Sequence, residues 1–217
     1  MSAHTQKSPA GVTGSGDEGE PSPAVASPAG DMRAAIMAAA ARLFAERGYN
    51  ATSVRAVVEH AGCKKPTLYY YFANKEHLFL EVIESSCAQL NALVESALAT
   101  EGNVRQRLHR ALSAYLAHVR EDPTLLRLLM TAERHPEQGQ PFFDFDALRQ
   151  HHVEGLRAIF EEGVQRGELR ADLDMEEAVL ALFAIIDHRL VLSLHGRPLP
   201  GDLPARLLDL FFHGVGA

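Results

Sequence analysis

Apolar side chains recur every three or four residues along most of the chain, from about residue 31 to the C-terminus. No stretch shows the sustained apolar–polar alternation of a β-strand, so the predicted fold class is all-α. Glycines and prolines interrupt the period where helices are expected to end. The pattern predicts helices at about 31–47, 53–61, 65–72, 75–98, 103–120, 123–134, 144–166, 174–195 and 203–213.

Short polar residues precede several of these helices. Asp31, Thr52 and Asn74 are predicted N-caps of the first, second and fourth helices, because their side-chain oxygens can accept hydrogen bonds from free backbone N–H groups. Gly48 is predicted to end the first helix. The first two helices carry apolar stripes at Ile36, Ala40, Leu43 and Phe44, and at Val54, Val57, Val58 and Ala61.

Residues 1–30 differ from the rest in composition. Fourteen of them are Gly, Pro or Ser, and Val12 and Val25 are the sizeable apolar residues among them. Such a segment buries too little apolar surface to offset the entropy lost on ordering. We therefore expect residues 1–30 to be a disordered tail.

The second and third predicted helices are short and are joined by a tight turn, Ala61-Gly62-Cys63. Two short helices joined by a turn with glycine are typical of a helix-turn-helix, whose second helix enters the DNA major groove. Cys63 is interpreted as a packed thiol without chemistry. Residues 31–82 are thus predicted to be a three-helix DNA-binding domain.

The third helix carries three consecutive tyrosines behind two lysines. Leu68 and Phe72, four residues apart, are expected to face inward. The tyrosine hydroxyls would then be free to bind phosphate oxygens, and one ring could pack against a base or a thymine methyl group. On spacing alone, Tyr69 and Tyr71 could also be half-buried packing residues with polar tips.

Residues 33–82 resemble the N-terminal domain of TetR/AcrR-family transcriptional regulators. The family pattern appears in order over about fifty residues, as Arg33, Ile36, Ala40, Leu43-Phe44, Gly48-Tyr49, Thr52-Ser53-Val54, Ala61-Gly62, Leu68-Tyr69-Tyr70-Tyr71-Phe72, Asn74-Lys75-Glu76 and Leu78. The resemblance implies a sequence-specific DNA-binding regulator, most simply a ligand-responsive repressor that binds a palindromic operator as a homodimer. It favours the DNA-binding interpretation of the tyrosines.

The resemblance also implies roles for single residues. Ser53 would bind phosphate and Arg55 could reach a base. The start of the third helix, residues 65–67, would point at base edges. Tyr69, Tyr71 and Lys75 would bind phosphates, and Tyr70 would touch the sugar-phosphate or a methyl group. The predicted DNA-binding set is Thr52, Ser53, Arg55, Lys64, Lys65, Pro66, Thr67, Tyr69, Tyr70, Tyr71 and Lys75.

Lys64 departs from the family pattern. The family usually has Ser or Thr there, as the cap of the recognition helix. Lysine cannot accept the capping hydrogen bond, so this cap is expected to contribute about 1 kcal/mol less. The departure leaves open which residue begins the third helix, but it does not change the assignment of the helix-turn-helix motif.

Charge is unevenly distributed along the chain. The net charge of −7 argues weakly against a nucleic-acid binder. Residues 31–80, however, carry +3, whereas residues 81–217 carry −8. A positive module on an acidic body is expected where one end of a protein meets phosphate.

Cellular location is suggested by what the sequence contains. Cys63 and Cys87 are the two cysteines, so no disulfide framework is implied. We see no signal peptide, and the longest strongly apolar run, residues 178–186, is far too short to span a bilayer. A reduced, cytoplasmic protein that does not enter a membrane is the expectation.

Residues 83–217 are predicted to form an all-helical effector-binding and dimerisation domain. Here the family resemblance is one of organisation, with a variable helical domain that binds a small molecule. Excess apolar surface on the last two helices suits a four-helix dimer interface, although an ordinary monomeric core is the alternative. The candidate interface is Val179, Phe183, Ile186, Leu190, Leu207, Leu208 and Phe211.

The effector pocket is weakly specified by the sequence. Its candidate lining residues, each of which could be plain core, are Met130, Phe142, Phe143, Phe145, His152, Phe160, Phe183 and Arg189. No cofactor motif is found, and no enzyme is predicted. A small metal-binding protein or enzyme that uses the histidines, such as His188 and His195 on one helix face, is the alternative, and an effector-free DNA-binding protein is another.

Overall fold

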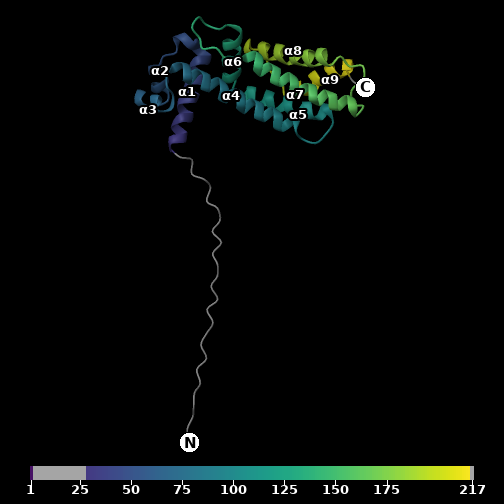
Figure 1. Cartoon of the computed structure of the whole chain (residues 1–217), viewed down its shortest axis with the longest axis horizontal. Coiled ribbons are helices and arrows are strands. Elements are labelled where there is room, and N and C mark those ends of the chain that lie inside the picture. Colours follow the sequence, from purple (N-terminus) through teal and green to yellow (C-terminus); the bar gives the residue numbers. More distant parts are fainter. Residues whose placement is uncertain (2–27, 216–217) are drawn as a thin grey trace.

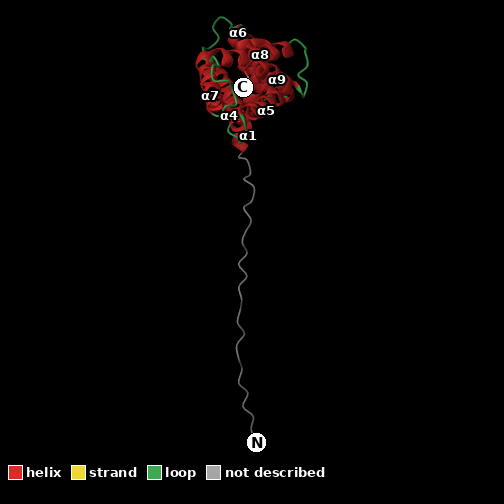
Figure 2. Cartoon of the chain, turned by 90° about the vertical axis from the view of Figure 1, so that its right-hand side faces the viewer, coloured by secondary structure: helices red, strands yellow, loops and turns green. Residues whose placement is uncertain are grey.

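The computed structural model describes Met1 and residues 28–215, and the part of the chain it describes consists of helices and loops without a strand (Figure 2). The helices are α1 Pro28–Ala51, α2 Val54–His60, α3 Lys65–Tyr71, α4 Lys75–Leu98, α5 Val104–Glu121, α6 Thr124–Arg134, α7 Phe145–Gln165, α8 Met175–Leu194 and α9 Leu203–Val215. The all-α prediction is confirmed. The predicted tail lies almost entirely outside the described residues.

Three details of the first helices differ from the prediction. α1 begins at Pro28, so Asp31 lies inside its first turn and is not its N-cap. Gly48 does break the helix, because its φ of 81° and ψ of 174° are not helical. The N-cap of α2 is Ser53, whose hydroxyl oxygen accepts from the Ala56 N–H at 3.1 Å, and not Thr52.

The molecule is elongated. α2 and α3 lie at one end, and the C-terminus lies at the other (Figure 1). Between them α4 runs from its N-cap Asn74, which accepts from the His77 N–H, into the body, where it packs against α5. One helix therefore belongs to both ends of the molecule.

Two clusters of buried side chains divide the core. One lies under α1–α3 and includes Phe44, Leu68 and Phe72, but it also takes in Leu128 and Ala132 of α6. The other lies among α5, α7, α8 and α9 and includes Phe160 and Val179. Because α6 and the start of α7 complete the first cluster, the end of the molecule that carries α2 and α3 is packed firmly onto the body.

Candidate nucleic-acid interface and ligand cavity

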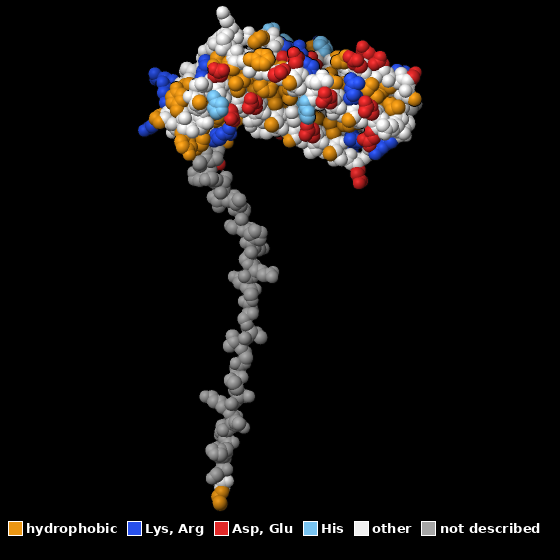
Figure 3. Space-filling view, viewed as in Figure 1, with side chains coloured by type: hydrophobic (Ala, Val, Ile, Leu, Met, Phe, Trp, Pro, Cys, Tyr) orange, Lys and Arg blue, Asp and Glu red, His pale blue; other side chains and the backbone are white. Residues whose placement is uncertain are grey.

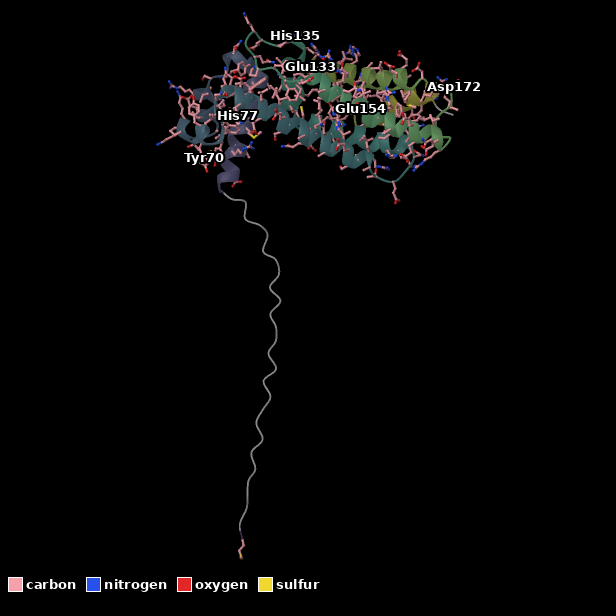
Figure 4. The ribbon with its side chains drawn as sticks, viewed as in Figure 1. Tyr70, His77, Glu133, His135, Glu154 and Asp172 are labelled. Carbon is pink, nitrogen blue, oxygen red and sulfur yellow. The ribbon has the colours of Figure 1, made fainter. Side chains whose placement is uncertain are left out.

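α3 presents its polar and aromatic side chains at the tip of the molecule. Leu68 and Phe72 are fully buried and fix the helix, as the sequence predicts. Tyr69 and Tyr70 are exposed at 51% and 80%, and Tyr70 projects from this end (Figure 4). The Tyr70 and Tyr71 rings meet edge to face, with 4.9 Å between centroids. The packing-only alternative therefore fails for Tyr69, whereas Tyr71 is half-buried.

Most of the other predicted contact residues lie on the same surface. Ser53, Arg55, Lys64, Lys65 and Pro66 are exposed, and Thr67 is half-buried. Lys and Arg side chains gather at this end of the molecule (Figure 3). Lys64 occupies the N-cap position of α3 and makes no side-chain capping bond, as its chemistry predicts.

Two of these residues already have partners. The Arg55 guanidinium donates to Glu59 one turn later, at 2.8 Å, on an exposed surface. The Ser53 hydroxyl accepts the capping bond of α2, but its own proton is free to donate. A phosphate oxygen could take that proton without disturbing the cap.

Thr52 is the clear correction to the predicted set. Its side chain is fully buried, and its hydroxyl lies 3.1 Å from the Leu43 carbonyl and 2.8 Å from the Gly48 carbonyl. It therefore cannot touch DNA, and it holds the end of α1 to the start of α2. The sequence did not reveal this because Thr52 and Ser53 are both good capping residues.

Lys75 has a structural task besides any contact with DNA. Its ammonium donates to the carbonyls of Tyr49 at 2.9 Å and Thr52 at 3.1 Å, and it lies 4.0 Å from the centre of the Tyr49 ring. Burial lowers the pKa of Lys75, and the Glu137 carboxylate opposes that shift. One of its three N–H donors remains for another acceptor.

The loop between α6 and α7 closes over the same junction. The Glu137 carboxylate accepts from the Asn50 backbone N–H at 2.6 Å, and the Asn50 amide donates to the Gln138 carbonyl at 2.9 Å. A Cβ atom on Gly48 would lie 1.7 Å from a Glu137 oxygen. The φ of 81° at Gly48 favours glycine, and a side chain there would also displace the Glu137 carboxylate.

A cavity of about 430 Å³ lies in the body. This volume falls within the usual range for small-molecule sites. The walls come from five helices and consist of Leu90, Asn91, Val94, Glu95 and Leu98 of α4, Leu108, Ala111, Leu112 and Tyr115 of α5, His151, His152, Glu154, Gly155 and Leu156 of α7, Leu182, Phe183, Ile186, Asp187 and Leu190 of α8, and Leu208 of α9.

Of the eight predicted pocket residues, His152 and Phe183 line this cavity and the others do not. Phe160 is buried in the core and stacks on Phe211. Phe142 is exposed, and Arg189 points to the α8–α9 loop, where it donates to Pro198. The remaining three, Met130, Phe143 and Phe145, pack against the two core clusters.

The sequence missed most of the cavity for a physical reason. Leu90, Val94 and Leu98 form a stripe four residues apart, as any core-facing helix does. On α5, Tyr115 belongs to a similar apolar stripe with Leu108 and Leu112. Nothing in that pattern distinguishes a wall that faces a partner helix from one that faces an empty space.

The predicted dimer residues are mostly used within the chain. Val179, Leu190, Leu207, Leu208 and Phe211 are buried in its own core, and Phe183 and Ile186 line the cavity. Most of these side chains are therefore not exposed on the single chain, as a contact with a second chain would require. Among the described residues, the large apolar side chains that α8 and α9 leave exposed are Leu180 at 47% and Leu210 at 66%.

Among the described residues there is no group of three or more His, Cys, Asp or Glu side chains placed to hold a metal ion. No helix in the described part of the chain is long and apolar enough to cross a membrane.

Two family models together match most of the described chain. The family model "Bacterial regulatory proteins, tetR family" matches residues 36–82, and "Tetracyclin repressor-like, C-terminal domain" matches residues 88–211. The regulator YdgC of Bacillus subtilis is 27% identical over 190 residues, which cover 85% of this chain and 93% of YdgC.

One further relative and one solved structure are also similar to this chain. The transcriptional repressor KstR2 of Rhodococcus jostii is 26% identical over 146 residues, covering 67% of this chain and 72% of KstR2. The fold is shared with the regulator FadR of Bacillus subtilis, solved in complex with stearoyl-CoA, at a TM-score of 0.68, 22% identity, and coverage of 83% of this chain and 98% of FadR.

Proposed function

This chain belongs to the TetR family of bacterial regulatory proteins and is a DNA-binding transcriptional regulator, and we propose that it is a ligand-responsive repressor that binds a near-palindromic operator as a dimer. Residues 31–82 would be the DNA-binding domain, and residues 83–217 would bind the effector and dimerise. The protein would work in the cytoplasm, on DNA, and not as an enzyme.

The observation that carries this proposal is the exposed face of α3. A short helix is held by the buried Leu68 and Phe72, while Lys65 and Tyr70 project from the tip of the molecule. This is the arrangement in which a recognition helix enters the major groove. Residues 65–67 would meet base edges, and Ser53, Tyr69 and Tyr71 would meet phosphates.

Ligand control is supported by the path of α4. Its first half contributes Leu78, Phe79 and Val82 to the core under α1–α3. Its second half forms one wall of the cavity, through Leu90 and Val94. A ligand that moves this wall would tilt α4 and shift the DNA-binding domain with it.

The dimer is supported by the outer face of α8 and α9. Leu180 and Leu210 leave an apolar surface on the two helices that end the chain. Two copies joined there would make a four-helix contact. The two copies of α3 would need to lie about 34–36 Å apart to enter successive major grooves.

The first experiment captures genomic DNA fragments on the purified protein and sequences them. A shared near-palindromic site is the expected result. Binding to that site is then measured by fluorescence anisotropy for wild type, Lys65→Ala, Tyr69→Phe and the matched control Arg127→Ala, which removes an exposed cation from α6.

The variants should separate two kinds of contact. Lys65→Ala should change base preference, with about 1–3 kcal/mol of discrimination lost at one position. Tyr69→Phe should weaken all DNA sequences alike, because it removes a phosphate contact. Arg127→Ala should bind as wild type does. If both α3 variants also bind as wild type does, α3 is not the reader and the proposal fails.

A further inference from the structure

The charged side chains that line the cavity between α4, α5, α7 and α8 are mainly acidic. Among the described residues, Glu95, Glu154 and Asp187 line it, and no Lys or Arg does. Of its two histidines, His152 has a lowered pKa, first because the side chain is buried and then because His151 lies beside it. An acidic ligand would thus find no Lys or Arg among the described residues of this wall, and His151 is already paired with Glu95.

Each of the three carboxylates already has a partner. Glu95 lies 2.9 Å from His151, Asp187 accepts from Arg134 at 2.6 Å, and Glu154 accepts from Gln150 at 3.1 Å. Glu154 lies on the body of the molecule, away from the α3 tip (Figure 4). An anionic group would lose its water and meet these negative charges, which is costly without a paired cation.

Most of the remaining wall is apolar. Leucine, valine and isoleucine side chains supply most of it, together with Ala111 and the rings of Phe183 and Tyr115. The ligand must therefore be largely apolar, because burial of such surface is what would drive its binding.

Within this wall, the Tyr115 hydroxyl has no hydrogen-bond partner among the described residues. Two further polar side chains of the wall are hydrogen-bonded to each other, since His152 Nε2 and Asn91 Oδ1 lie 2.7 Å apart. Burial raises the pKa of Tyr115, so the phenol keeps its proton and stays a donor. The hydroxyl belongs to a residue that lines the cavity, so a ligand that fills the cavity without accepting from it would leave a donor unpaired, which is costly.

We infer that this cavity takes an uncharged, largely apolar molecule with one oxygen acceptor, such as a carbonyl, which receives a hydrogen bond from Tyr115. The inference deepens the proposed function, since it names the chemical class of the effector. It excludes free carboxylates and other anions from that class.

The test uses three probes that share a ten-carbon aromatic skeleton. Butylbenzene lacks an acceptor, butyrophenone carries a ketone, and 4-phenylbutanoate carries a carboxylate. Their binding to the full-length protein at pH 8 is measured by isothermal titration calorimetry. We expect butyrophenone to bind with a 1:1 stoichiometry and at least about tenfold more tightly than 4-phenylbutanoate.

Tyr115→Phe removes the donor and keeps the ring. It should weaken butyrophenone binding about five- to tenfold and leave butylbenzene binding within about twofold, because a neutral hydrogen bond contributes about 1 kcal/mol. Butylbenzene therefore also reports whether the variant has kept its cavity. If Tyr115→Phe does not fold, the ranking of the three probes by the wild-type protein still decides the inference.

Several outcomes would overturn the inference. These are a carboxylate that binds as tightly as the ketone, equal losses of both uncharged probes in Tyr115→Phe, or no binding of any probe up to its solubility limit. Operator binding by the ligand-free protein is measured separately. Retained operator binding would then show that the ligand class is wrong while the proposed function stands, and its loss would count against the function itself.

Discussion

Single residues at the junction of α1, α2 and α4 do more than the sequence suggests. Thr52 and Lys75 direct a hydroxyl and an ammonium onto backbone carbonyls at the end of α1 and at its junction with α2. Such groups must be paired when buried. The junction therefore sets how the DNA-facing helices leave the body, even where its residues cannot reach DNA.

Thr52→Val keeps the shape of this side chain and removes its hydroxyl. The carbonyls of Leu43 and Gly48 would lose their partner, so the free energy of unfolding should fall by about 1–3 kcal/mol. Chemical denaturation followed by circular dichroism measures this. Thr52→Ser, the control that keeps the hydroxyl, should lose less. Weaker DNA binding at unchanged stability would instead indicate a direct contact.

His152 makes stability depend on pH. Its pKa in the folded protein lies below the ordinary value of 6.5, through burial first and then His151, with Arg149 in the same direction and Glu95 opposing. Between the folded pKa and 6.5, the unfolded chain therefore binds more protons at His152 than the folded chain does. The stability due to neutral His152 is present above pH 6.5 and is lost as the pH falls through the folded pKa.

His152→Gln tests this linkage. The free energies of unfolding of the variant and the wild type are compared at pH 7.5 and pH 5.5. The advantage of the wild type should be smaller at pH 5.5, because there folding must work against protonation of His152. An advantage that is equal at both pH values, or larger at pH 5.5, would contradict the assignment.

At the scale of elements, α7 links the two halves of the molecule. Its first residue, Phe145, packs against the core under α1–α3. Its middle lines the cavity through His152 and Gly155, and its end packs on α5 at Gly163. The helix therefore spans the cavity between two fixed contacts.

The two glycines of α7 should respond oppositely to alanine. A Cβ at Gly163 would lie 2.6 Å from a Val104 methyl and 3.0 Å from Leu169, so Gly163→Ala should cost about 1–3 kcal/mol. A Cβ at Gly155 meets nothing within 4 Å, so Gly155→Ala should gain about 0.5–1 kcal/mol from reduced chain entropy. Thermal and urea unfolding measure both, and equal effects would refute the packing described.

At the scale of the whole molecule, the exposed face of α8 and α9 is expected to join two chains. Replacing Leu180 and Leu210 by Glu places charges on that face. Dimerisation should weaken by at least about tenfold, since buried unpaired charges are strongly unfavourable in an interface. Analytical ultracentrifugation measures the dimer, and operator binding should weaken with it.

Phe142→Ser is the matched control for this experiment. Phe142 is another large exposed apolar residue, but it lies on the α6–α7 loop. Its replacement should leave the dimer intact. A double Glu variant that remains a dimer would place the interface elsewhere.

The sequence by itself determined what depends on local order along the chain. The helical period fixed the all-α fold, the position of Asn74 fixed the start of α4, and the spacing of Leu68 and Phe72 fixed which face of α3 is buried. These follow from geometry within one or two turns of helix, where neighbours in sequence are neighbours in space.

Only the tertiary structure decided what depends on distant residues. In the folded chain the Thr52 side chain is buried and Ser53 is the N-cap of α2. Val179 and Phe211 are buried in the chain's own core, and Tyr115 lies in the wall of the cavity. An apolar stripe indicates that a helix face is buried, but it does not indicate which part of the structure covers that face. Whether a second helix, a second chain or an empty space covers that face is fixed by how all the helices pack together.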